Sequence, residues 1–287
     1  MIRGRVMCSI LELMPRCNEF GMHEILVSDP NGTSHLDASV WKNEEEPEEE
    51  ETRPEGAGSV VQAHYGQGSG GVYLPCGAGS LKNCTDLPRE TVAAQMEGGL
   101  PFEVELNSAE PQVLIMHTHT TETFEPCVRS EYDPSFNYRT TDPAYNMVSV
   151  GDAITEQLEA AGIHTIHDTT IHDYPSYNGA YERSAETVKQ YLEQYPSICV
   201  VLDIHRDAIQ SDNTLSQPIV EIDGREAAQV MIISGCDDGT MEMPNYLQNF
   251  HFACRLQGNL EGMYPGLTRP ILFDYRKYKI SPQAACS

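Results

Sequence analysis

Two short stretches of the sequence combine histidine and acidic side chains directly after apolar runs. His119 and Glu122 follow the apolar run 113–116, and His205 follows the apolar run 198–202. Two imidazoles and one carboxylate form a ligand set that suits Zn²⁺ and leaves one coordination position for water. Because zinc lowers the pKa of bound water to near neutrality, the pattern predicts a hydrolase in which His119, Glu122 and His205 bind the metal.

The residues around these three leave the assignment open. His117 is an alternative ligand to His119, or a residue that donates a hydrogen bond to a ligand. Asp203 and Asp207 flank His205, and Asp207 is predicted to orient the imidazole ring, since Asp203 belongs to the strand itself. A single histidine at a strand end is more often a solvated side chain than a ligand, so the prediction depends on the residues acting together.

A polar and aromatic stretch between residues 167 and 183 is long enough to border a pocket. His172 and Asn178 are predicted to contact substrate there, and His167 and His172 are also alternative ligands. Arg183 opens a predicted helix, where a cation opposes the helix dipole, and this favours an anionic substrate group nearby. A solvated loop, with Arg183 in a salt bridge to a neighbouring carboxylate, is the alternative interpretation.

These residues need a scaffold that brings two strand ends together. Continuous apolar runs predict buried strands, and apolar residues at helical spacing predict helices between them. The predicted strands span 113–116, 163–166, 197–204, 219–222 and 230–234, and the predicted helices span 87–96, 142–162, 180–194 and 245–263. This alternation predicts an α/β fold of three layers, with a largely parallel sheet and helices on both faces. Ligands bind at the carboxyl ends of the strands in such sheets, where the candidate residues lie.

Three regions are predicted along the chain. Residues 1–60 contain the acidic block 44–51 and are predicted to be a disordered N-terminal segment, because like charges without apolar residues build no core. Residues 61–110 are predicted to form a small region of short strands and a helix. Residues 111–287 are predicted to form the catalytic domain.

The composition argues against several classes of function. A net charge of −25 over 287 residues argues against nucleic acid as a partner and against electrostatic binding to anionic membranes. No run of 18 apolar residues marks a membrane-spanning helix. The nine cysteines form no CxxC pair, so a zinc ribbon is not expected.

The sequence resembles stage II sporulation protein P of spore-forming Firmicutes over roughly residues 60–280. The resemblance rests on His-Thr-His-x-Thr-Glu, on Asp-hydrophobic-His-Arg-Asp, and on the segments 113–122, 141–146, 167–183 and 201–207. It implies a zinc N-acetylmuramoyl-L-alanine amidase, which cleaves the lactyl amide of peptidoglycan, and some members also cut stem-peptide crosslinks. It implies action with the stage II sporulation proteins D and M on the septal wall during engulfment. By position, the zinc roles fall to His119 (or His117), Glu122 and His205.

The two ends of the chain depart from the family pattern. Family members carry an N-terminal membrane anchor and work outside the cytoplasmic membrane, and no anchor precedes the acidic segment here. A strand with the general-base glutamate is expected beyond Ser287, so the catalytic domain is expected to be truncated. A catalytically impaired peptidoglycan-binding or scaffold protein of the same fold is therefore the alternative function. A metal-dependent peptidase acting on proteins is a third.

Overall fold

The computed structural model describes residues 56–275 except 101, 125–128, 241–242 and 244, together with the backbone of Val6 and Met7. These residues form four helices and strands in three sheets. The α/β class predicted from the sequence is confirmed. The acidic block 44–51, Cys286 and Ser287 lie outside the described residues.

The central sheet is entirely parallel, with the order β1-β8-β5-β7. Its strands are β1 (Val6–Met7), β8 (Val200–Asp203), β5 (Val113–Met116) and β7 (Thr165–His167). Val113 is paired with Val200, and Met116 is paired with Asp203. Since both strands end at this pair, the segments that follow them start side by side at one edge of the sheet.

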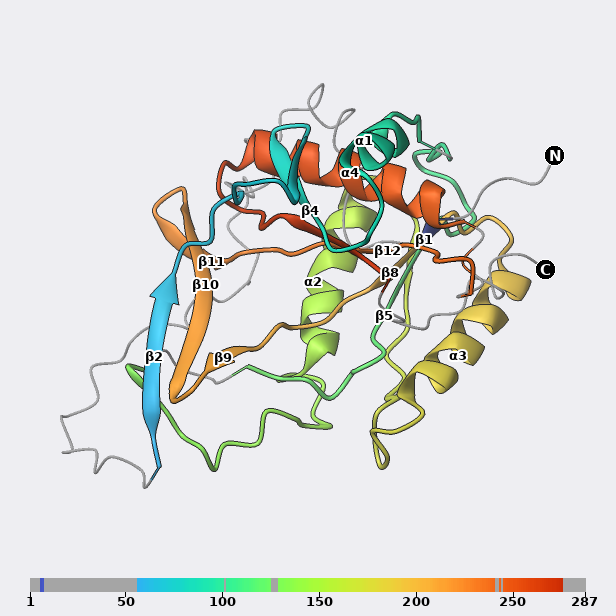
Figure 1. The fold of residues 1–287 in the computed structure, drawn as a ribbon. Helices are drawn as coiled ribbons and strands as arrows, with labels where there is room; N and C mark the ends of the chain where they lie inside the picture. Colours follow the sequence, from blue (N-terminus) through green and yellow to red (C-terminus); the bar gives the residue numbers. More distant parts are fainter. Residues whose placement is uncertain are drawn as a thin grey trace.

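Helices cover both faces of this sheet because every side chain of β5 is apolar and buried. Val113 and Ile115 pack in one core cluster with α2 and α4, whereas Leu114 and Met116 pack in a second cluster with α3. Alternate strand residues point to opposite faces, so a strand without polar residues needs a cover on each side. The helices are α1 (Arg89–Met96), α2 (Met147–Ala160), α3 (Ala180–Gln194) and α4 (Tyr246–Met263); Figure 1 shows α3 and α4 on different sides of β5 and β8.

Local sequence explains where α2 begins and ends. The predicted helix 142–162 starts instead at Met147, because the Asn146 side chain accepts a hydrogen bond from the amide of Val148 and caps the first turn. At the other end Gly162 has a φ of 78°, the left-handed conformation that ends many helices.

Two of the predicted strands, 219–222 and 230–234, do not belong to the parallel central sheet but overlap strands of other sheets. Segment 219–222 is the end of β10, which pairs in parallel with β2 and antiparallel with β9 and β11. This second sheet contains β2 (Gly58–Ala63), β6 (Glu131–Tyr132), β9 (Ile209–Ser211), β10 (Thr214–Ile222) and β11 (Arg225–Ala228). In Figure 1, β2 and β10 lie on the side of the molecule away from α3. β2 also places Gly58–Val60 in a strand, inside the segment predicted to be disordered.

The third sheet has the order β12-β13-β4-β3 and lies beneath α4. Its strands are β3 (Tyr73–Cys76), β4 (Gly79–Asn83), β12 (Ile233–Gly235) and β13 (Ile271–Asp274). Leu74 and Leu81 of this sheet share a core cluster with Val113 of the central sheet. Residues from the region 61–110 thus pack against the same core as the strands that carry the candidate site.

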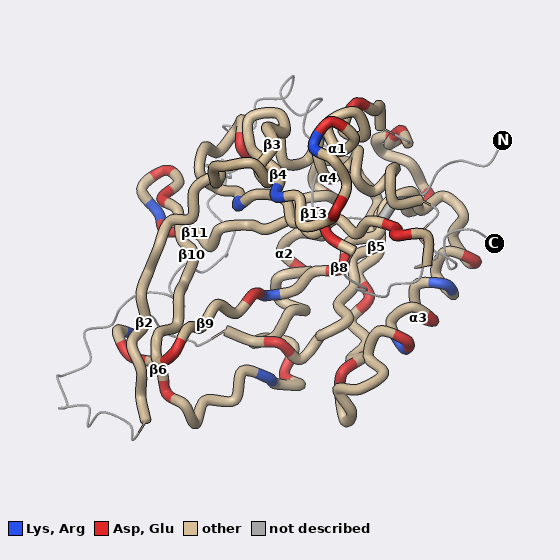
Figure 2. Tube along the Cα trace, viewed as in Figure 1, with Lys and Arg blue, Asp and Glu red and all other residues tan. Residues whose placement is uncertain are grey.

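Acidic residues are spread along the described chain, with few Lys and Arg among them (Figure 2). In the part of the chain that the structure describes, none of the helices has the length and apolarity needed to span a membrane.

Candidate metal centre

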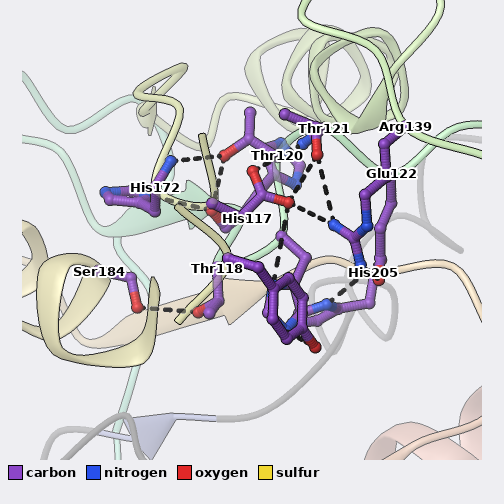
Figure 3. A network of polar contacts seen from close by, with 12 residues as sticks. His117, Thr118, Thr120, Thr121, Glu122, Arg139, His172, Ser184 and His205 are labelled. Carbon is purple, nitrogen blue, oxygen red and sulfur yellow. Dashed lines mark hydrogen bonds and ion pairs between the residues drawn. The ribbon is translucent and has the colours of Figure 1, made fainter. Parts of the chain in front are cut away.

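The loops after β5 and β8 are tied to each other by hydrogen bonds. Asp203, the last residue of β8, accepts from the Thr118 amide at 2.9 Å and from the Thr118 hydroxyl at 2.8 Å. The Ile204 amide donates to the Met116 carbonyl at 3.0 Å. The predicted convergence of the two histidine-bearing segments at one sheet edge is confirmed (Figure 3).

Glu122 and His205 lie at the spacing of two ligands of one metal ion. Glu122 Oε2 is 3.5 Å from His205 Nδ1. Zinc–ligand bonds of 2.0–2.2 Å at tetrahedral angles place two donor atoms about 3.4 Å apart. The side chain of His205 is 29% exposed and that of Glu122 12%, so the pair is reached by solvent from the His205 side.

His119 lies next to this pair, and one of its nitrogens makes no hydrogen bond within the described part of the chain, although it lies 3.9 Å from Asp173. Its ring centroid is 5.3 Å from that of His205. Nδ1 of His119 is buried and makes no hydrogen bond to the described residues. Burial lowers the pKa of His119, which favours the neutral imidazole that binds metals. Imidazole and carboxylate are zinc ligands by type, although no group of three or more His, Cys, Asp or Glu side chains in the described residues is already arranged to hold an ion.

Asp203, not Asp207, orients His205. Asp203 Oδ2 is 2.9 Å from His205 Nε2, so the other ring nitrogen points to Glu122. Burial opposes the charge on His205, but the two carboxylates outweigh it and raise its pKa to about 10. Asp207 lies 2.7 Å from Arg269 instead. The prediction for Asp207 is wrong because β8 ends at Asp203, so residue alternation no longer sets the direction of later side chains.

His117 uses both ring nitrogens inside the protein. Nδ1 lies 2.9 Å from the Ile204 carbonyl, and Nε2 lies 3.0 Å from Nε2 of His167. His167 in turn contacts Asp152 through Nδ1 at 2.8 Å. The His117 side chain is fully buried, and burial lowers its pKa to about 4. Its environment is that of a buried neutral histidine that supports the loop, in contrast to His119.

Of the residues predicted to bind substrate, one is buried, one holds a loop together and one is exposed. His172 is buried, with its ring nitrogens 2.9 Å from the His117 carbonyl and 3.0 Å from the Thr187 hydroxyl, so it does not face a pocket. Arg183 donates to the carbonyls of His172, Ser176 and Asn178 and holds the loop between them. Asn178 is exposed, and its substrate contact stays a prediction.

Arg139 and Tyr177, which were not among the predicted site residues, also lie at the site. The Tyr177 ring is stacked on the His119 ring, with centroids 4.7 Å apart. The guanidinium of Arg139 lies over the same Tyr177 ring, 4.7 Å from its centroid. Arg139 also binds Asp173 at 2.6 Å and lies 3.7 Å from Glu122. No periodic pattern marks these residues. The one sequence signal was the aromatic content of 167–183, which contains Tyr177.

Replacing Arg183 with glutamine is expected to loosen the loop 172–178, which carries Asp173 and Tyr177. Three carbonyl bonds from one charged donor are lost, so amide exchange in this loop should rise about tenfold or more. Hydrogen exchange read by mass spectrometry measures the change. Lys189→Gln, also on the exposed side of α3, is the control and should leave the loop unchanged. Unchanged exchange in Arg183→Gln would contradict this role.

Comparisons with known proteins agree with the motifs at this sheet edge. The family model for stage II sporulation protein P matches residues 23–284. The curated stage II sporulation protein P of Bacillus subtilis (strain 168) is 30% identical over 162 residues, which cover 54% of this chain and 37% of the relative. The match thus spans well under half the length of that relative. No solved structure matches the chain. Because the family model covers most of the sequence, the chain belongs to the stage II sporulation protein P family.

Proposed function

We propose that this protein is a zinc-dependent peptidoglycan hydrolase, an N-acetylmuramoyl-L-alanine amidase that acts on the septal wall during sporulation. The observation that carries the proposal is the pair Glu122 and His205, whose donor atoms lie 3.5 Å apart, with the ring of His119 centred 5.3 Å from that of His205. Membership of a sporulation family supplies the biological setting.

His119, Glu122 and His205 would hold the metal. When bound, zinc supplies a Lewis acid and a water that ionises near neutral pH. Asp203 fixes the ring of His205 through Nε2, which is the usual arrangement of a carboxylate behind a metal-binding histidine. Stacking of Tyr177 on His119 limits rotation of that ring. Of the two neighbouring histidines, His119 suits the ligand role better, since both nitrogens of His117 are already engaged.

Arg139 would change the electrostatic environment of the same centre through its contacts with two carboxylates. Its guanidinium lies between Asp173 and Glu122, at 2.6 Å and 3.7 Å. Pairing with Arg139 compensates the charge of the fully buried Asp173 carboxylate, which also lies 3.9 Å from Nδ1 of His119. The arginine is about one third exposed, with 36% of its side chain accessible, and can contact an anionic part of a substrate at the same time.

The family also suggests where and with what the protein acts. We place it outside the cytoplasmic membrane at the septum, with the stage II sporulation proteins D and M as partners. This part of the proposal is supported by family membership alone.

The test is metal removal with separate readouts for zinc, wall binding and wall cleavage. The purified chain is expected to contain one zinc by mass spectrometry and to release N-terminal alanine from purified sacculi. A chelator should abolish this release, and added Zn²⁺ should restore it. Release that persists in metal-free protein would reject the zinc mechanism. Zinc-containing protein that binds sacculi without releasing amino termini would favour the non-catalytic binding function.

A further inference from the structure

A pocket lies directly beside the candidate metal centre. Its volume is about 330 Å³. Thr123 and Phe124, which follow Glu122, line one part, and residues 206–209, which follow His205, line another. The pocket therefore begins one residue away from two of the proposed ligands. It lies between these loops and the second sheet, because residues of β10 and β11 complete the lining.

Most of the wall is apolar. Ile209, Leu215 and Ile219 contribute aliphatic side chains from β9 and β10, and Phe124 and Tyr138 contribute aromatic rings. Phe124 is 53% exposed, although it is a large apolar side chain. β10 likewise leaves most of its side chains only half-buried. An apolar recess of this size with few polar groups is typical of a pocket for a small ligand or part of a larger one.

Arg206 supplies the positive charge of this pocket. Its guanidinium lies over the Tyr138 ring at 5.3 Å, and one terminal nitrogen donates to the Tyr138 carbonyl at 3.4 Å. Its Nε is buried and makes no hydrogen bond to any described residue. A buried charged donor without an acceptor is unfavourable, and a carboxylate oxygen would satisfy it.

The acidic side chains of the lining already have partners. Asp207 Oδ2 binds Arg269 at 2.7 Å, and Glu226 Oε2 accepts from Gln62 at 3.2 Å. Neither is paired with Arg206 within the described residues. In a chain with a net charge of −25, an arginine without a carboxylate partner at the edge of an active site selects for an anion.

We infer that this pocket is the subsite for the stem peptide of the wall, with Arg206 binding a peptide carboxylate and the apolar wall contacting the small aliphatic side chains. The inference rests on the proposed function, which puts a peptide amide at the metal. A glycan strand is a poorer occupant, because the hydroxyl and amide oxygens of its sugars are weaker acceptors for a guanidinium than a carboxylate is. The short distance from the pocket to Glu122 and His205 places the bound peptide next to the bond to be cut.

The experiment measures peptide binding by calorimetry, without any need for turnover. The probe is a synthetic stem tripeptide, alanyl-γ-glutamyl-lysine with free carboxylates, compared with the same peptide fully amidated and with a peptide-free disaccharide whose lactyl carboxyl is amidated. Wild-type protein should bind the carboxylate form best. Arg206→Gln should weaken that binding about tenfold or more, and Arg206→Lys should restore part of it because charge returns without the planar guanidinium. Zinc content should stay unchanged in both.

Two further variants keep the test decisive. Arg225→Gln makes the same substitution at an exposed site on β11 outside the lining, and should bind the tripeptide as the wild type does. If Arg206→Gln does not fold, Phe124→Ala can be used instead. It removes an exposed ring from the lining of the pocket and should weaken tripeptide binding several-fold. Equal affinity for the free and amidated peptides, or disaccharide binding that depends on Arg206, would overturn the subsite. If tripeptide binding depends on Arg206 but the protein cleaves no wall, the peptide subsite is supported and the proposed hydrolase activity is rejected.

Discussion

Replacing His205 with alanine is expected to remove zinc from the protein and to abolish wall cleavage. Replacing a residue that hydrogen-bonds to a metal ligand lowers metal affinity by up to about 100-fold. Because His205→Ala removes a ligand itself, its loss in metal affinity should be larger. Two carboxylates, Asp203 at 2.9 Å and Glu122 at 3.5 Å, converge on this ring. Zinc content by mass spectrometry and alanine release from sacculi measure the two effects.

The control for this prediction is His164→Ala. His164 precedes β7, and its ring contacts only the Ala109 carbonyl among the hydrogen bonds described for it. Its replacement should leave zinc content and cleavage unchanged. A His205→Ala protein that melts as the wild type does and still contains one zinc would remove His205 from the ligand set. The proposed centre would then have to be built from His119 and Glu122 alone.

The position of the site was predictable because it depends on strand order and strand ends alone. The apolar run 113–116 and the apolar run that ends before Asp203 predicted two buried strands followed by histidines. Parallel strands in one sheet end at the same edge, so Glu122 and His205 had to lie close together once β5 and β8 were neighbours. The helix 180–194 was likewise predicted to its last residue.

The supporting residues were not predictable, because loops set them and loops have no period. Asp207 was preferred to Asp203 on the view that a strand residue is structural, yet a residue at the last position of a strand faces the site directly. Arg139 reaches Glu122 through an isolated bridge between their backbones, a contact that no periodic pattern marks. The ring of His172 contacts the His117 carbonyl and the Thr187 hydroxyl, and Arg183 donates to carbonyls of the loop 172–178, so neither set of partners is marked in the sequence.

The division into three sheets was missed for a related reason. A strand pattern shows that a segment is extended, and it does not show which strand it pairs with. β10 has half-buried side chains along most of its length, unlike the fully buried β5. β10 contains Ser216, Gln217 and Pro218, and polar residues and a proline argue against a place in the central sheet.

The second prediction concerns the core that holds the third sheet under α4. Replacing Phe250 with alanine is expected to lower the free energy of unfolding by about 3–5 kcal/mol. Phe250 is fully buried in α4 and is stacked on Phe273 of β13, with ring centroids 4.3 Å apart. The substitution removes both apolar burial and this ring contact, and the cavity is too confined by the neighbouring strands to collapse. Urea unfolding monitored by circular dichroism gives the change.

Leu247 provides the matched control on the same helix. It lies one turn before Phe250 and is 36% exposed, so Leu247→Ala should cost less than about 1 kcal/mol. Both variants lie far from Glu122 in sequence, and zinc content should follow the folded fraction in each. A Phe250→Ala protein as stable as Leu247→Ala would show that α4 does not pack on β13 as described. The third sheet would then lack its main apolar cover, and the core that it shares with β5 would not be packed as described.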